Sequence, residues 1–164
     1  MPGIWHQAGC CCAAKPCVDC YVTQPDLVAT TSGVCNATCS AWAGTYSIFG
    51  WSVCYDPGDP NQTPCCYWEW RKTAGSTIWG IQIVCCPGPP VKFYGSATRS
   101  GTSSYRFGGN TVPDCGFWAG SSSIWKVITG SVQCNPDTGY LAGAFVLDGI
   151  DSCAGCSLPV SLGG

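Results

Sequence analysis

Two pairs of cysteines have the spacing of a thiolate metal site. One C-x-x-C pair stands near the start of the chain and the other near its end. Four thiolates supplied in this way bind zinc tetrahedrally. The halves of common zinc motifs are separated by about 15–20 residues, but the termini of compact domains often lie close together. A structural zinc ion bound by Cys17, Cys20, Cys153 and Cys156 is therefore one hypothesis.

Disulfide bonds are the favoured alternative use of the cysteines. The chain has 16 cysteines among 164 residues, which is typical of disulfide-stabilised scaffolds. We expect most of them to be paired, and a zinc site or buried free thiols stay open for the rest. Vicinal cysteines such as Cys65 and Cys66 point to opposite faces of a strand. Each would then need a different partner, or one would pack in the core.

Residues for acid–base or nucleophilic catalysis are scarce. The chain has one histidine, His6, and one glutamate, Glu69. A catalytic triad would have to recruit His6, and a glycosidase would need a second carboxylate across a cleft from Glu69. No spacing in the sequence pairs either residue with a partner. We expect no enzyme and assign no catalytic residues.

Tryptophans offer a second kind of chemistry, because their rings can stack on sugars. Trp68 and Trp70 alternate with Tyr67, Glu69 and Arg71, so on a strand the two tryptophans share one face with Cys66. We expect that face to be buried, which favours core packing. A glycan-binding platform that also uses Trp51, Trp79, Trp118 and Trp125 is the alternative.

The elements that must position these residues are β-strands. Period-two alternation predicts strands at 27–31, 44–53, 66–71, 78–85, 91–94, 104–107, 124–132 and 140–147. In the fourth of these, Trp79, Ile81 and Ile83 share one face. Residues 135–139 read Asn-Pro-Asp-Thr-Gly, a strong turn signal between the last two strands. No stretch has helical periodicity, so we expect almost no helix.

These elements predict an all-β fold. About nine short strands separated by Gly, Pro and Ser turns indicate a β-sandwich or an open barrel of short antiparallel strands. Residues 1–23 and 148–164 are expected to be irregular, cysteine-pinned termini around it. We find no linker, so residues 1–164 are expected to form a single cysteine-rich β domain.

Charge is unusually sparse. Charged residues make up 10% of the chain, with a net charge of −2, against about 25% in ordinary soluble domains. No basic cluster suits nucleic acid or a membrane surface, and we see neither a secretory signal nor a transmembrane segment. A surface this neutral favours association. We therefore expect a homo-oligomer, covered by copies of itself or by other subunits.

Several short motifs are shared with one group of proteins. They are a CC-x-x-x-x-C-x-x-C head at 11–20, the stretch PDLVATTSG at 25–33, AGTYSI at 43–48, IWGIQIVC at 78–85 and CSLPVSL at 156–162. The chain resembles cysteine-rich β-structured virion accessory proteins of tailed bacteriophages. The resemblance implies a head decoration, tail or baseplate accessory protein without enzymatic activity, located in the virion.

Two functions follow as expectations. The first is a non-enzymatic structural subunit of a virion that packs into a larger assembly. The second is a secreted or surface binding module, stabilised by disulfides, with glycans as the expected ligand. An enzyme is a distant third. No cofactor is expected beyond the structural zinc of the cysteine hypothesis.

Overall fold

The computed structural model describes residues 22–31, 37–55, 64–86, 92–101, 104–107, 123–125, 128–134, 140–150 and 155–163. Most of these residues lie in strands, and the one helix among them, α1, covers only Ala37–Ser40. The expectation of an all-β fold with almost no helix is confirmed.

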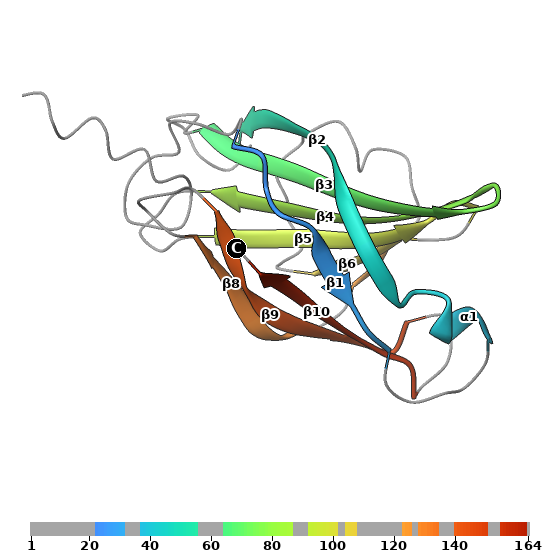
Figure 1. Ribbon diagram of the computed structural model, residues 1–164. Helices are drawn as coiled ribbons and strands as arrows, with labels where there is room; N and C mark the ends of the chain where they lie inside the picture. Colours follow the sequence, from blue (N-terminus) through green and yellow to red (C-terminus); the bar gives the residue numbers. More distant parts are fainter. Residues whose placement is uncertain are drawn as a thin grey trace, which may run out of the picture.

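Ten strands form one continuous sheet (Figure 1). They are β1 (Leu27–Ala29), β2 (Gly44–Tyr55), β3 (Pro64–Ala74), β4 (Thr77–Cys86), β5 (Lys92–Arg99), β6 (Ser104–Phe107), β7 (Ser123–Trp125), β8 (Ile128–Cys134), β9 (Leu141–Asp148) and β10 (Ser157–Gly163). Their order across the sheet is β7-β6-β5-β4-β3-β2-β1-β10-β9-β8. Neighbouring strands are antiparallel except β6 and β7, which pair in parallel.

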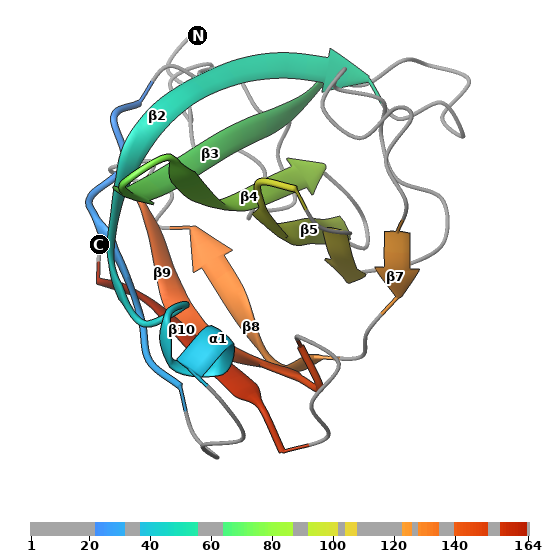
Figure 2. The same cartoon turned by 90° about the vertical axis from the view of Figure 1, so that its right-hand side faces the viewer.

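The sheet curls into a nearly closed barrel (Figure 2). Its two edge strands, β7 and β8, are separated in the chain by residues 126–127 alone. The polypeptide therefore passes directly from one edge of the sheet to the other. Of the two architectures expected from the sequence, the open barrel is the one formed.

Aromatic side chains meet across the barrel interior. Phe107 on β6 and Phe145 on β9 have ring centroids 5.0 Å apart, although seven steps of the sheet order separate their strands. Trp42, just before β2, meets Tyr105 of β6 edge to face at 6.2 Å. All four side chains are buried. Such contacts, between strands far apart in the sheet order, fix the curvature of the sheet.

The strand faces agree with the alternation in the sequence. Trp68 and Trp70 of β3 are fully buried in the core, as are Ile81 and Ile83 of β4. Adjacent strands place Trp68 opposite Ile83 and Trp70 opposite Ile81. The core interpretation of these tryptophans is confirmed.

The C-terminal part of the chain differs from expectation. Residues 148–164 were expected to be irregular, but Ser157–Gly163 form β10, which lies between β1 and β9. Pro159 hides this strand in the sequence, because proline cannot donate to a ladder. It is tolerated because β1 ends at Ala29, opposite Val160, so no β1 residue pairs with Pro159. Its carbonyl still accepts from Thr30 N–H at 2.9 Å.

Strand length also differs. The strands were expected to be short, but β2, β3 and β4 have 12, 11 and 10 residues, well above the usual five or six. Together they form a long three-stranded ribbon.

The turn from α1 into β2 is held by a lysine. Lys72 of β3 donates hydrogen bonds to the carbonyls of Ala41 and Ala43. Its ammonium lies 4.6 Å from the Trp79 ring centroid, and burial lowers its pKa. Gly44 makes the approach possible, since a Cβ there would lie 3.3 Å from Lys72 Cδ.

Gly95 of β5 provides a sharp test of the interior packing. A Cβ at this position would lie 2.1 Å from Phe107 Cζ and 2.8 Å from the Gln82 carbonyl oxygen. We expect Gly95→Ala to lower the free energy of unfolding by about 1–3 kcal/mol, because Phe107 must move away from Phe145. Chemical denaturation of the oxidised protein measures the change.

Gly50→Ala is the matched control, since a Cβ at Gly50 meets nothing within 4 Å. Its stability should stay within about 0.5 kcal/mol of the parent. Equal stability of the two variants would show that Phe107 does not pack on Gly95.

Candidate interaction site

The proposed zinc ligands are not brought together among the described residues. Cys156 forms a disulfide with Cys39 of α1, with their Cα atoms 5.9 Å apart. A sulfur in a disulfide is not a thiolate ligand, so the structure gives Cys156 a different role. Cys17, Cys20 and Cys153 lie outside the described residues.

Two further described cysteines take part in disulfides. Cys65 and Cys66 of β3 are also disulfide-bonded, and both are fully buried. Within the described residues, no three His, Cys, Asp or Glu side chains gather where a metal ion could bind. Cross-linking is therefore the role seen for these cysteines, in line with the favoured interpretation of the sequence.

The proposed sugar platform is divided between core and surface. Trp68, Trp70 and Trp79 are buried, so their ring faces are not offered to a ligand. Trp51 of β2 is 40% exposed. The indole of Trp125 and all of Trp118 lie outside the described residues, as does His6.

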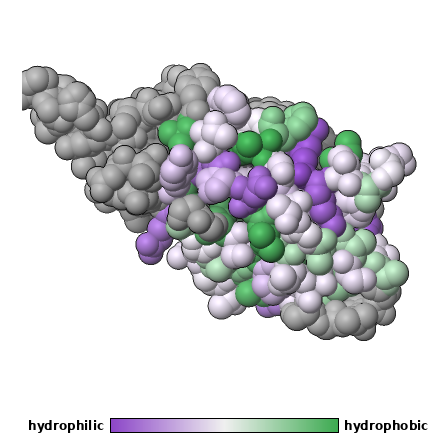
Figure 3. Space-filling model, viewed as in Figure 1, coloured by the Kyte–Doolittle hydropathy of each residue, from purple (hydrophilic) through white to green (hydrophobic). Residues whose placement is uncertain are grey.

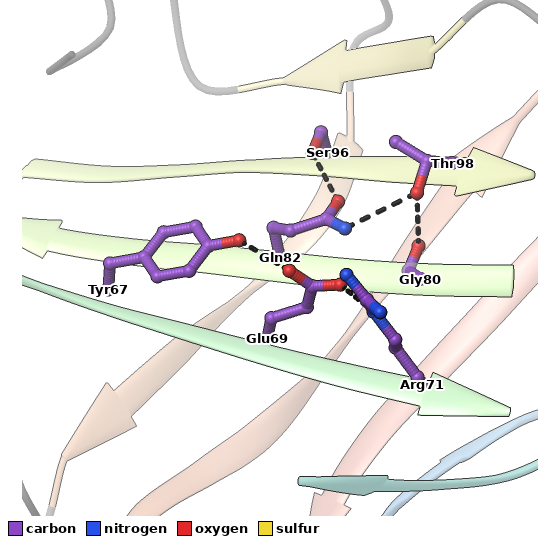
Figure 4. Close-up of polar contacts among 7 residues, drawn as sticks. All are labelled: Tyr67, Glu69, Arg71, Gly80, Gln82, Ser96 and Thr98. Carbon is purple, nitrogen blue, oxygen red and sulfur yellow. Dashed lines mark hydrogen bonds and ion pairs between the residues drawn. The ribbon is translucent and has the colours of Figure 1, made fainter. Parts of the chain in front are cut away.

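A buried polar network lies on the outward face of β3. Glu69 is 3% exposed, and its Oε1 accepts a hydrogen bond from the Tyr67 hydroxyl at 2.9 Å. Its other oxygen, Oε2, accepts from Arg71 Nε in an ion pair. Figure 4 shows the carboxylate held between these two donors. Because Tyr67 and Trp68 are both buried, β3 is covered on both faces here.

The neighbouring strands extend this polar layer. Gln82 of β4 lies opposite Glu69 on one side and Ser96 of β5 on the other. Its side-chain oxygen accepts from Ser96 Oγ at 2.5 Å, and its Nε2 donates to Thr98 Oγ1 at 3.3 Å. Thr98 in turn donates to the Gly80 carbonyl at 3.4 Å (Figure 4). Hydrogen bonds thus engage the amide and hydroxyl groups of Gln82, Ser96 and Thr98.

Electrostatics keep the tyrosine of this network protonated. Burial raises the pKa of Tyr67 far above its ordinary value of 10.0, and the adjacent charge of Glu69 raises it further. With both carboxylate oxygens engaged and the phenol retaining its proton, the arrangement is suited to holding side chains in place. Proton transfer would require one of these groups to be released.

The network ends at an exposed aromatic ring. The pairing of β2 with β3 contains a β-bulge between Ile48 and Gly50, and bulges redirect side chains. The residue at the bulge, Phe49, is 60% exposed, the largest exposure among the described large hydrophobic residues. The Arg71 guanidinium carbon lies 3.5 Å from the centre of its ring. Arg71, which is paired with Glu69, therefore packs on one face of the exposed Phe49 ring.

A second exposed region lies on the outward face of β1, β8, β9 and β10. Its side chains are small, apolar or uncharged polar groups, and Asp148 alone among those described carries a charge. They are Val28, Thr129, Ser131, Gln133, Ala142, Ala144, Val146, Asp148, Ser157, Pro159 and Ser161. We call this surface the uncharged face. In Figure 3 it is mostly white and green, with purple concentrated over β2–β5.

A shallow groove of about 320 Å³ opens on the uncharged face. Val28, Val146 and Pro159 line it with apolar side chains from three strands. Ala144, Thr129 and Ser161 also line it, the last two with hydroxyl-bearing side chains. An apolar hollow flanked by a few polar groups is suited to receiving an apolar side chain.

Comparison with known proteins adds no relative: no family model, curated protein or solved structure matches the chain. Of the described helices, none has the length and hydropathy to cross a bilayer.

Sequence reasoning found part of this site. It placed Tyr67, Glu69 and Arg71 on one strand face, which is correct, and their contacts follow from that spacing. It missed Phe49, because a bulge leaves no regular signal in the alternation. It also missed the groove, because Val28 and Val146 come from strands far apart in the chain.

The role of the buried carboxylate can be tested directly. Glu69→Gln keeps the shape of the side chain but removes the charge that pairs with Arg71. We expect the free energy of unfolding to fall by about 1–3 kcal/mol, the cost of weakening charge-assisted hydrogen bonds at a buried site. The exposed Asp26→Asn is the control and should change stability by no more than about 0.5 kcal/mol. Urea titration of both variants measures the difference.

The buried phenols predict alkaline instability. Burial raises the pKa of both Tyr46 and Tyr67 above 10.0 in the folded protein, so the unfolded chain loses these protons first. The stabilisation that the two buried phenols contribute is complete below about pH 10. Above that pH the free energy of unfolding decreases by up to about 1.4 kcal/mol per pH unit for each tyrosine. Denaturation curves between pH 8 and 11, with reactive thiols blocked, measure the slope. Tyr67→Phe should reduce it; an unchanged slope would contradict this origin.

Proposed function

We propose that this protein is a non-enzymatic structural subunit that packs against copies of itself in a larger assembly. The uncharged face carries the proposal. Eleven outward positions on four strands include one charge, that of Asp148. Surfaces of soluble monomers usually contain about 25–35% charged residues, and neutral surfaces with apolar hollows favour association.

A virion is the proposed setting of this assembly, as a head decoration, tail or baseplate accessory protein. The motif resemblance to phage accessory proteins supports the setting, and the cross-linked core suits a particle that must last outside cells. The disulfide between Cys39 and Cys156 and the disulfide-bonded residues Cys65 and Cys66 are the described parts of that core. Immunogold labelling of virions whose genome encodes the chain would test the location.

A non-enzymatic role agrees with the state of Glu69. This carboxylate, the only glutamate of the chain, is buried and accepts hydrogen bonds from Tyr67 and Arg71. A general acid or base must reach substrate, and Glu69 is 3% exposed.

Glycan binding remains the alternative, and one observation favours it. Phe49 and Trp51 are both partly exposed on β2, and aromatic rings can stack on sugars. Trp68, Trp70 and Trp79 are buried in the core. A glycan would therefore find fewer exposed rings than the sequence suggested.

Assembly can be tested with one charge on the uncharged face. Ala144 is exposed and lines the groove, so Ala144→Glu should leave folding intact. We expect native mass spectrometry and light scattering to show large assemblies of the parent protein. Association of the variant should be weakened about tenfold or more, because a contact would bury the new carboxylate unpaired.

Ser76→Glu adds the same charge at the exposed tip of the β3–β4 hairpin, away from that face, and should assemble like the parent. A parent protein that is monomeric at high concentration would rule out the proposed function. Retention of a glycan-array ligand by that monomer would then support the alternative.

A further inference from the structure

We infer that the ring of Phe49 in one copy docks in the groove of the uncharged face of a second copy. This inference rests on the proposed function and names the contact by which copies would join. Among the described residues, Phe49 on β2 is the most exposed large hydrophobic side chain, and the groove lies on β1, β8, β9 and β10. With 60% of Phe49 exposed, the ring does not occupy the groove of its own chain.

The ring is prepared for binding. Arg71 stacks on Phe49 at 3.5 Å from the ring centre, and Glu69, itself held by Tyr67, fixes Arg71. An exposed side chain that is already ordered loses little conformational freedom when a partner covers it. Aromatic residues and arginine are also the residues most often found at the energetic centres of interfaces.

The groove has the size and chemistry for this ring. Cavities of about 150 Å³ accommodate benzene, and the groove is about twice as large at about 320 Å³. Val28, Val146 and Pro159 would contact the ring, and the small side chain of Ala144 leaves it room. The groove lining contains no charged residue that the ring would have to desolvate.

Charge favours pairing of the two unlike surfaces. Arg71, whose side chain is 32% exposed, lies beside Phe49. Asp148, the single charge of the uncharged face, lies two residues beyond Val146 of the groove. Docking Phe49 in the groove brings a cation towards an anion. A contact between two uncharged faces would offer neither Asp148 a cation among the described residues, so the unlike contact is favoured.

A mixing experiment tests the contact. Phe49→Ser removes the ring but leaves the groove, and Ala144→Phe fills the groove but leaves the ring. Each variant alone should self-associate about thirtyfold more weakly than the parent or worse, as expected on losing a central interface contact. An equimolar mixture retains one intact contact and should give a 1:1 heterodimer in native mass spectrometry.

Matched controls are available on the β3–β4 hairpin. Ile78→Ser removes an exposed apolar side chain and Ala74→Phe adds a ring at an exposed position, and both should assemble like the parent. Circular dichroism and peptide mapping of the Cys39–Cys156 bond confirm that each variant is folded.

A second variant tests the charge argument without changing the apolar contact. Asp148→Lys would place a cation opposite Arg71 and should weaken association about tenfold or more at low salt, with partial recovery at high salt. Ser76→Lys adds a cation at the exposed tip of the β3–β4 hairpin, away from that face, and should have little effect.

The results separate this inference from the proposed function. If the parent assembles and Phe49→Ser or Ala144→Phe assembles equally well, the contact is wrong while the structural role stands. A mixture that yields no heterodimer from two folded variants also overturns it. A monomeric parent removes the proposed function first, and the inference with it.

Discussion

The barrel depends on aromatic side chains that meet in its interior from strands far apart in the sheet order. Phe107 reaches Phe145 across the barrel only because Gly95 leaves the space that a Cβ would occupy. A flat sheet of ten strands would keep β6 and β9 far apart, so these contacts require the curl. The curl in turn gives the protein a convex exterior, on which Phe49 and the uncharged face are separate surfaces.

The sequence predicted the parts of the fold that are governed by alternation. The faces of β3 and β4 are as expected because Trp68, Trp70, Ile81 and Ile83 follow a strict period of two. It did not predict β10, whose apolar alternation is interrupted by Pro159. That residue is acceptable only because β1 stops at Ala29, which is a property of the neighbouring strand and not of the segment itself.

The same distinction, between local pattern and contacts with a neighbouring strand, explains which parts of the candidate site could be predicted. The shared face of Tyr67, Glu69 and Arg71 is local and could be predicted. Phe49 could not, because its direction depends on a bulge in the pairing of two strands. The bonding of Cys156 could not be predicted for the same reason. C-x-x-C spacing relates Cys156 only to Cys153, whereas its disulfide partner Cys39 is 117 residues away.

That bond between Cys39 and Cys156 has a mechanical consequence. It encloses β2 to β9 in one covalent ring, while β1 precedes the ring and β10 follows it. The two excluded strands are paired with each other, so tension applied at both ends of the chain would peel them apart first. The load would then pass through the sulfur bridge, and the polypeptide inside the ring could not be stretched out while that bridge remained closed.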